Sequence, residues 1–398
     1  MASERKNILK EIAKRIDVGE DTRELKKDFV KTLGVVNPAE MMLVKDELIR
    51  EGLSNEVFQT LYNMSLEVFR DTVQAQKPIV PKGHPIHTLM SEHALLMEYA
   101  NELHSLTKTI SEEESEPNPA YLDRIRQLLE FFGESTTHYL REENALFPVL
   151  EKHGLTGPPA AMWSEHQEIH EIEKGLFDLN SDSNKELIEN LGKLSNASTT
   201  LANMLASHFN KENNILFPAS LRLFGEQEWE IVIQDFDDIG YCSYSIKPVG
   251  IRAPVQVEKP IVSEGSEVVF GSGKLSVDTL EAIFKHLPID MTFVDAQDRV
   301  QFFSESPDRI FVRSRAVIGR SVQLCHPKKS VHVVEQILND FRKATRDSAE
   351  FWINLGGKTI HIRYFAVRDS EKKYLGCLEV SQDITEILKI SGEKRLLD

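Results

Sequence analysis

The sequence is poor in cysteine, in basic residues and in long apolar runs, and each shortage excludes a class of protein. Its 398 residues include three cysteines, far apart at positions 242, 325 and 377. Three distant cysteines supply neither a disulfide framework nor a cysteine-only metal site, and they fit a reducing compartment. No stretch reaches the ~18 apolar residues that a membrane-spanning helix needs, and the N-terminus has no apolar signal segment. We therefore expect a cytoplasmic protein.

The charge balance excludes two further kinds of partner. Asp and Glu number 63 against 47 Lys and Arg, which gives a formal net charge of −16 at pH 7. Nucleic acids and anionic membranes are bound by basic faces, so we expect neither as a partner. The hydrophobic share of 41% and the charged share of 28% are ordinary for a globular protein. A chain of this length is expected to form two or three domains.

Changes in sequence pattern divide the chain into four segments. The first predicts short helices without a chemical motif, which we interpret as a small packing or docking domain. The second follows a proline-rich stretch and carries four long segments of helical period, as a four-helix bundle requires. The third, rich in Pro, Gly and Val, is predicted to be a linker, and the fourth is predicted to be an α+β domain. The segments are 1–75, 76–240, 241–273 and 274–390.

The fourth segment has the alternation of an antiparallel sheet. The pattern predicts a hairpin over 290–304 and three strands over 350–385, with an amphipathic helix over 330–344 between them. Glycines and polar residues mark the turns between the strands. These turns are predicted near 296–298, 356–357 and 369–373.

One motif occurs twice in the predicted bundle. HYLREENALFP at 138–148 and HFNKENNILFP at 208–218 share the frame H-x-x-x-E-x-N-x-L-F-P. The tripeptide SEH also occurs twice, at 91–93 in the first long helix and at 164–166 in the third. The bundle is therefore predicted to contain two copies of a helical hairpin, related by an approximate twofold axis.

The repeated His and Glu residues have the spacing of metal ligands. Residues four apart lie on one face of a helix, about one turn from each other. A lone His on an apolar stripe is usually a hydrogen-bonded core residue. Three pairs of donors and a further His, spread over four helices, would be costly to bury without a metal. The predicted ligands are His93, His138, Glu142, His166, His170, His208 and Glu212.

The number of predicted ligands indicates the kind of metal site. Five imidazoles and two carboxylates exceed the ligands of one tetrahedral zinc and suit two metals bridged by the carboxylates. Nitrogen and oxygen donors favour iron, manganese or zinc over copper(I). The two halves differ because Met97 aligns with His170. The metal near His93 and His138 should therefore keep an open position for a small ligand, lined by Met97.

Two further histidines precede the first predicted ligand. His84 and His87 lie at the start of the first bundle helix. His87 is six residues from His93, which corresponds to about 240° round the helix, so it should not share the ligand face. An accessory ligand or a gate is therefore the less favoured interpretation of this pair.

The pattern H…HxxxE…HxxxH…HxxxE on four helices resembles the hemerythrin family, in its HHE cation-binding branch, over about residues 84–225. The resemblance implies an up-down four-helix bundle with a non-haem di-iron centre that binds dioxygen. It also implies that the five histidines are terminal ligands and that Glu142 and Glu212 are bridging carboxylates. Hemerythrin has an aspartate five residues after its last His, whereas Glu212 follows His208 by four.

The fourth segment resembles a PAS sensor domain over 275–388. LEAIFKHLPIDMTFVDAQDRVQFFS is similar to its opening helix and hairpin, and YLGCLEVSQDIT to its last strand. Such domains bind small molecules or haem, or they dimerise. Cys325 and His326 could form a haem-ligand loop, although such a pair at a helix N-terminus is commoner without haem. Residues 1–75 resemble the uncharacterised helical domain that precedes hemerythrin and PAS domains in bacterial proteins.

The preferred function is a bacterial sensor. We expect two non-haem irons to bind or react with dioxygen, nitric oxide or peroxide, and the PAS domain to pass the state to a partner protein or within a homodimer. The same centre could instead serve an enzyme, such as a peroxidase, a nitric oxide reductase or an iron donor for Fe–S cluster repair. A third interpretation is a metal-stapled scaffold or a metal-storage protein. The predicted fold class is multidomain and mainly α, with a hemerythrin-like four-helix bundle, an α+β PAS domain and a small N-terminal helical domain.

Overall fold

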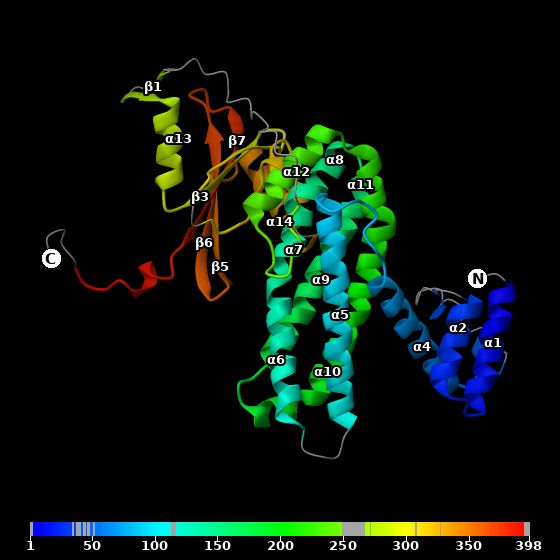
Figure 1. Ribbon diagram of the computed structural model, residues 1–398. Helices are drawn as coiled ribbons and strands as arrows, with labels where there is room; N and C mark the ends of the chain where they lie inside the picture. The colour runs from blue at the N-terminus through cyan, green and yellow to red at the C-terminus, as the bar shows by residue number, and fades with distance from the viewer. Residues whose placement is uncertain are drawn as a thin grey trace. The chain divides into compact units, whose positions relative to one another are not determined.

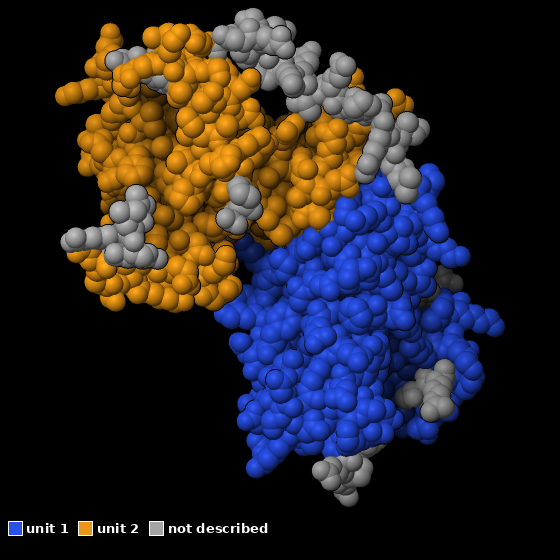
Figure 2. Space-filling view, turned by 60° about the vertical axis from the view of Figure 1, so that its left-hand side comes forward, with its two compact units in different colours: residues 1–138, 165–222, 241–249 blue, residues 139–164, 223–240, 250–398 orange. Residues whose placement is uncertain are grey.

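The computed structural model divides the chain into two compact units. Residues 1–138, 165–222 and 241–249 form the first unit, and residues 139–164, 223–240 and 250–398 form the second (Figure 2). None of the described helices is long and apolar enough to cross a bilayer. The structure describes residues 3–33, 36, 41–42, 45, 48–50, 52–112, 117–248, 267–270, 272–306, 309–326 and 328–393.

Helices at the start of the first unit form a small core, as predicted. Among the described residues they include α1 (Ser3–Asp17), α2 (Thr22–Leu33) and α4 (Asn55–Gln74). The side chain of Ser54 accepts a hydrogen bond from the first turn of α4 at 3.2 Å, which pairs an N–H that has no partner within the helix. Buried residues of this core include Leu9, Ile12, Leu25, Phe29, Phe58 and Leu61.

The four long helical segments of the predicted bundle are present. α5 (Pro85–Glu112), α6 (Pro119–Glu134) and α10 (Asn184–Lys211) run side by side in the first unit (Figure 1). α6 continues as α7 (Thr136–Arg141), and the third long segment is α9 (Gly157–Leu179). α5 and α6 both begin at a proline, because the first turn of a helix needs no N–H from that residue.

Both copies of the repeated motif contain a π-helix. η1 (Glu142–Leu146) and η2 (Glu212–Leu216) each begin at the repeated Glu and end at the repeated Leu, just before the repeated Phe. In both, the Phe N–H bonds to the carbonyl of the Glu five residues before it. A proline follows at Pro148 or Pro218, and its ring would clash with the preceding turn of an α-helix. The wider π-turn accommodates that ring. The helices that follow are α8 (Phe147–Lys152) and α11 (Phe217–Leu223).

The second unit contains α12 (Glu226–Ile239) and a five-stranded antiparallel sheet of order β4-β3-β7-β6-β5. The amphipathic helix α14 (Lys328–Arg342) packs on this sheet, and Phe341 is its most buried aromatic residue. The mainly α class with an α+β C-terminal domain is therefore confirmed. The strands are β3 (Asp290–Asp295), β4 (Val300–Phe303), β5 (Ser348–Leu355), β6 (Lys358–Arg368) and β7 (Tyr374–Asp383), and the shorter helices are α13 (Val277–His286), η3 (Arg315–Val317), η4 (Val322–Cys325) and η5 (Ile387–Lys389).

The predicted turns lie between these strands. Asp298, Gly356, Gly357 and Lys372 all have positive φ angles, which sharp turns require. The end of the predicted linker differs from expectation because it forms a hairpin. Its strands are β1 (Glu267–Phe270) and β2 (Gly273–Ser276), and most of the remaining linker lies outside the described residues.

Gly376 generates a prediction for this sheet. A Cβ at this residue, whose φ is +155°, would lie 2.1 Å from the carbonyl oxygen of Val294 on the neighbouring strand. Gly376→Ala should therefore lower the free energy of unfolding of the second unit by at least about 2 kcal/mol. The three tryptophans all lie in this unit, so their fluorescence during denaturation measures the change.

Gly192→Ala in α10 is the control. An added Cβ there meets no atom within 4 Å, and Ala should favour the helix by up to about 1 kcal/mol. Equal unfolding midpoints for Gly376→Ala and the parent would contradict the close approach of β3 and β7.

Candidate metal centre

Two groups of buried side chains have the chemistry of metal ligands. Within each group the ligand atoms all lie within 4.8 Å of one another. Every member is at most 1% exposed. The groups share both carboxylates, which is the arrangement expected for two metals with carboxylate bridges. One group is His93, His138, Glu142 and Glu212, and the other is Glu142, His166, His208 and Glu212.

Glu212 contacts imidazoles from both ligand groups in the first unit. Its Oε2 is 3.3 Å from His93 Nε2, and its Oε1 is 3.2 Å from His208 Nε2. The Nε2 atoms of His93 and His138 are 3.1 Å apart, and those of His166 and His208 are 3.0 Å apart. Two donors that each lie about 2.1 Å from one metal, at 90–100° to each other, are about 3.0–3.2 Å apart. The observed spacing therefore suits two donors of one metal ion.

Two glutamates that sequence reasoning missed orient two of these imidazoles. Glu92 Oε2 accepts a hydrogen bond from His138 Nδ1 at 2.6 Å, and Glu165 Oε2 accepts one from His208 Nδ1 at 2.9 Å. A carboxylate ion only accepts, so Nδ1 carries the proton and Nε2 keeps its lone pair for a metal. Both glutamates belong to the repeated tripeptide SEH, so the repeat itself was the signal.

Asn213 orients His93 in the same way. Its Oδ1 accepts from His93 Nδ1 at 2.9 Å, while its Nδ2 donates to Gln76 Oε1 at 2.7 Å and so fixes the amide. His93 and His138 therefore direct two Nε2 lone pairs at each other across 3.1 Å. Lone pairs this close repel unless a proton or a metal ion lies between them. With the Glu212 carboxylate beside them, the residues present fit a metal ion.

The charges of the site support an ionised carboxylate. Burial by itself raises the pKa of Glu212, but attraction to His208 and hydrogen bonds from the imidazoles hold that pKa well below its usual value. Burial likewise lowers the pKa of His208, and Glu212 outweighs this effect, so the pKa of His208 is raised. A negative charge is thus stabilised in the core, at the place where a cation would bind.

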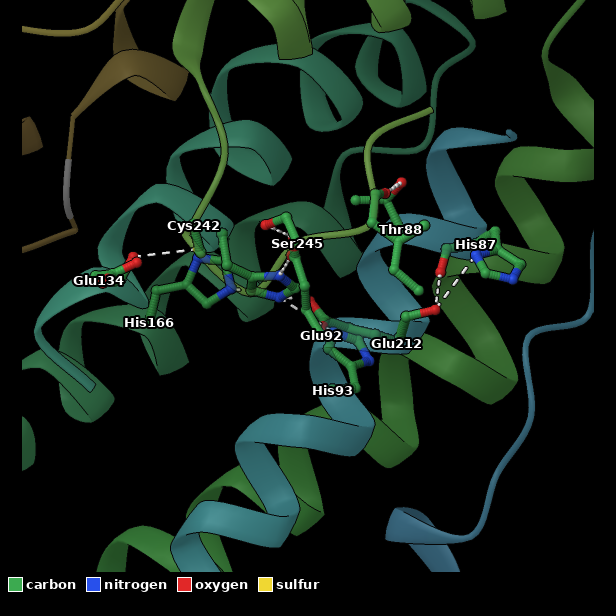
Figure 3. Close-up of polar contacts among 12 residues, drawn as sticks. His87, Thr88, Glu92, His93, Glu134, His166, Glu212, Cys242 and Ser245 are labelled. Carbon is green, nitrogen blue, oxygen red and sulfur yellow. Dashed lines mark hydrogen bonds and ion pairs between the residues drawn. The ribbon is translucent and has the colours of Figure 1, made fainter. Parts of the chain in front are cut away.

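A segment of the first unit contacts the side chain of Glu92. Residues 241–247 follow α12, and Ser245 Oγ donates to Glu92 Oε1, on the carboxylate that orients His138 (Figure 3). Thr88 Oγ1 donates to the carbonyl of Ile246 at 2.6 Å, which fixes the same segment to α5. This segment therefore helps to hold Glu92 in place, although none of its residues belongs to a ligand group.

Three histidines predicted as ligands or accessory groups of the bundle lie outside both groups found among the described residues. His170 Nδ1 is 3.3 Å from Glu173 Oε2, and the His170 side chain is 38% exposed, so its role as a ligand stays a prediction. Burial and the neighbouring His87 lower the pKa of His84 to about 4. His87 Nδ1 is 3.3 Å from Ser91 Oγ. Accessory roles for His84 and His87 also stay predictions.

Met97 is fully buried in α5, four residues after His93. The rings of Phe209 and Phe217 lie nearly parallel to the His93 ring, with centroids 3.9 Å and 5.4 Å away. These side chains surround the imidazole with apolar atoms and restrict water. The pocket predicted at Met97 stays a prediction.

A haem-ligand role for Cys325 and His326 stays a prediction, and the cavity beside His326 is small. His326 Nδ1 donates to the carbonyl of Val322 at 2.8 Å, and His326 lines a cavity of about 20 Å³ with Tyr364 and Glu379. A cavity of this size holds about one water molecule, whereas cofactor sites need ~300 Å³ or more. Burial also raises the pKa of the Cys325 thiol, which disfavours the thiolate that would bind iron.

Three family models match parts of the chain. The hemerythrin HHE cation binding domain matches residues 84–220, which include every residue of the two groups. A family of unknown function, DUF438, matches residues 9–75, and a PAS domain matches residues 280–385. No curated protein matches the chain.

Several solved structures are similar to the C-terminal part. A C-terminal domain from Streptococcus mutans is 34% identical over 32% of this chain and 98% of its own, with a TM-score of 0.31. A PAS domain from Colwellia psychrerythraea is 13% identical, over 27% of this chain and 97% of its own, with a TM-score of 0.23. A sensory box sensor histidine kinase from Vibrio cholerae is 10% identical, over 27% of this chain and 90% of its own, with a TM-score of 0.22.

The ligand groups and the matched families agree on one identity. The groups lie in the matched bundle, the DUF438 helices precede it, and the PAS sheet follows it. The chain therefore contains a hemerythrin HHE cation-binding domain, with a DUF438 segment before it and a PAS domain after it.

Proposed function

We propose that this protein is a cytoplasmic sensor in which two metal ions in the bundle bind or react with dioxygen, nitric oxide or peroxide. The observation that carries the proposal is the buried Glu212 carboxylate between two pairs of imidazoles. The PAS domain on the same chain supports a sensing role. We propose that the signal leaves through a partner protein or through a second copy of the chain in a homodimer.

Iron is the metal that we propose, because imidazole and carboxylate donors suit it and the small molecules named above are redox-active. The ions would be held by four imidazoles and by the carboxylates of Glu142 and Glu212. Once bound, they would supply the redox chemistry. Manganese and zinc accept the same donors, so metal analysis has to decide among the three.

The residues around the ligands hold the imidazoles in the orientation that a metal ion requires. Glu92 and Glu165 hold a proton of His138 and of His208 on Nδ1, so that Nε2 is the nitrogen that faces a metal. Lys211 forms an ion pair with Glu165 and offsets its negative charge. Removal of such supporting groups costs typically 10- to 100-fold in metal affinity.

The first test is metal content. Protein purified without oxygen should bind about two iron ions per chain, and Glu212→Gln should lose most of both, because its carboxylate is common to the two groups. His208→Ala should lose iron and also unfold at lower temperature when metal is supplied, since binding stabilises the folded state. Metal analysis and melting curves measure both effects.

His286→Ala is the matched control, because His286 is exposed in α13 and belongs to neither group. It should keep the parent's iron content and melting temperature. An iron content near one ion in the parent would contradict the two-metal assignment. A zinc-only protein that does not react with oxygen or nitric oxide would contradict the sensing function.

The second test concerns the open position predicted at Met97. If Met97 lines that position, Met97→His adds an imidazole that the small ligand must displace. Reaction of the reduced protein with oxygen or nitric oxide should slow by at least about tenfold, which corresponds to ~1.4 kcal/mol in the barrier. Iron content should not fall, because no ligand is removed. Stopped-flow absorbance measures the rate.

Met97→Leu controls for the loss of the thioether at nearly constant volume, and it should react at close to the parent's rate. If Met97→His reacts as fast as the parent, the open position lies elsewhere. Sustained turnover of peroxide or nitric oxide by the parent would favour an enzyme over a sensor.

A further inference from the structure

Pro148 leaves the first π-helix one main-chain donor short. An N–H at this position would serve the carbonyl of Asn144 in an α-turn or the carbonyl of Glu143 in a π-turn, and proline has none. Buried carbonyls without a donor cost free energy, so native structures pair them elsewhere. A donor from another part of the chain can therefore bond to a carbonyl of this turn in place of the missing N–H.

One loop of the PAS domain provides such donors. Ser314 Oγ donates to the carbonyl oxygen of Asn144, and Arg320 Nη1 donates to that of Glu143 at 3.2 Å. All four residues belong to the second unit (orange in Figure 2). The turn η3 lies between the two donors, and residues 314–320 are termed the docking loop.

Charged groups fix the docking loop in place. Arg320 donates to both carboxylate oxygens of Glu151 on α8, at 2.7 Å and 2.8 Å, and these side chains are only 5% and 6% exposed. The guanidinium also lies over the ring of Trp163, 5.6 Å from its centroid. Burial raises the pKa of Asp235 on α12 to about 6, and the nearby Ser314 hydroxyl and first N–H groups of η3 oppose this rise. A buried pair with two parallel hydrogen bonds fixes orientation as well as distance.

We propose that the docking loop reads the state of the metal centre through η1. This π-helix begins at Glu142, whose carboxylate belongs to both ligand groups. A change of ligand or redox state that moves this carboxylate also moves the following turn, which holds the carbonyls of Glu143 and Asn144. Their displacement changes the hydrogen bonds from Ser314 and Arg320. The inference rests on the proposed metal centre and adds the route by which its state reaches the PAS domain.

The first experiment tests the contact by hydrogen–deuterium exchange of the full-length, metal-free protein. Ser314→Ala removes the hydroxyl donor, so amide exchange over 142–150 should quicken by at least about fivefold. Ser314→Thr keeps a hydroxyl and should stay near the parent rate. Ser321→Ala is the matched control, because the Ser321 hydroxyl bonds to Gln323 instead. Equal exchange in Ser314→Ala and Ser321→Ala would overturn the proposal.

A proline pair tests the physical reason for the contact. Pro148→Ala supplies an N–H that competes with the docking loop, so exchange over 314–320 should quicken. Pro218→Ala makes the same change in the second motif and should leave exchange over 314–320 unchanged. The same exchange over 314–320 in both variants would overturn the role assigned to Pro148.

The second experiment tests whether the contact reports on the metal. In the parent, exchange over 314–320 should change by at least about threefold when iron(II) is loaded or when nitric oxide is then added. Ser314→Ala should lose this response while its iron content, measured in parallel, stays that of the parent.

The two possible failures are distinguishable. Iron that binds and reacts without altering exchange over 314–320 would overturn the docking proposal and leave the proposed function intact. A protein that binds no iron would overturn the proposed function, together with the route that rests on it.

Discussion

The burial of a charged carboxylate among imidazoles is the constraint on which the bundle depends. An isolated charge in an apolar core would be prohibitively costly, and the cost falls only if oppositely charged or metal-bound partners surround it. Glu212 has His93 and His208 beside its two oxygens. Glu92, Glu165 and Asn213 hold the imidazoles in turn. The long helices must therefore keep a common register, because a slip of one residue would separate these groups.

The π-helices extend this constraint along the chain. Each repeated motif places a glutamate before a turn that must accommodate a proline, so ligand chemistry and irregular backbone occur at the same place. At the first motif, Ser314 and Arg320 of the PAS domain donate to the carbonyls of Asn144 and Glu143 in this turn. A feature that distorts the helix thus also creates a contact surface for another domain.

The cavity among the core residues of the PAS domain is small. The cavity beside His326 has a volume of about 20 Å³, which leaves room for about one water molecule. A domain of this kind is suited to respond through its surface, where the docking loop contacts η1 and α8. The contacts of the docking loop with η1 and α8 are therefore more informative about function than the small cavity beside His326.

Local patterns in the sequence determined the helices, the strands of the sheet, the repeat and most of the buried ligands, because helical period, turn residues and the HxxxE frame are short-range signals. Only the tertiary structure decided which partner holds each imidazole, since Asn213 and His93 are 120 residues apart in sequence. It also decided that the His170 side chain is partly exposed and that the cavity beside His326 is small, because burial depends on neighbouring elements. The sequence shows that Pro148 lacks an N–H for the helix. The donors of the docking loop lie more than a hundred residues away in the chain, so no local pattern could identify them.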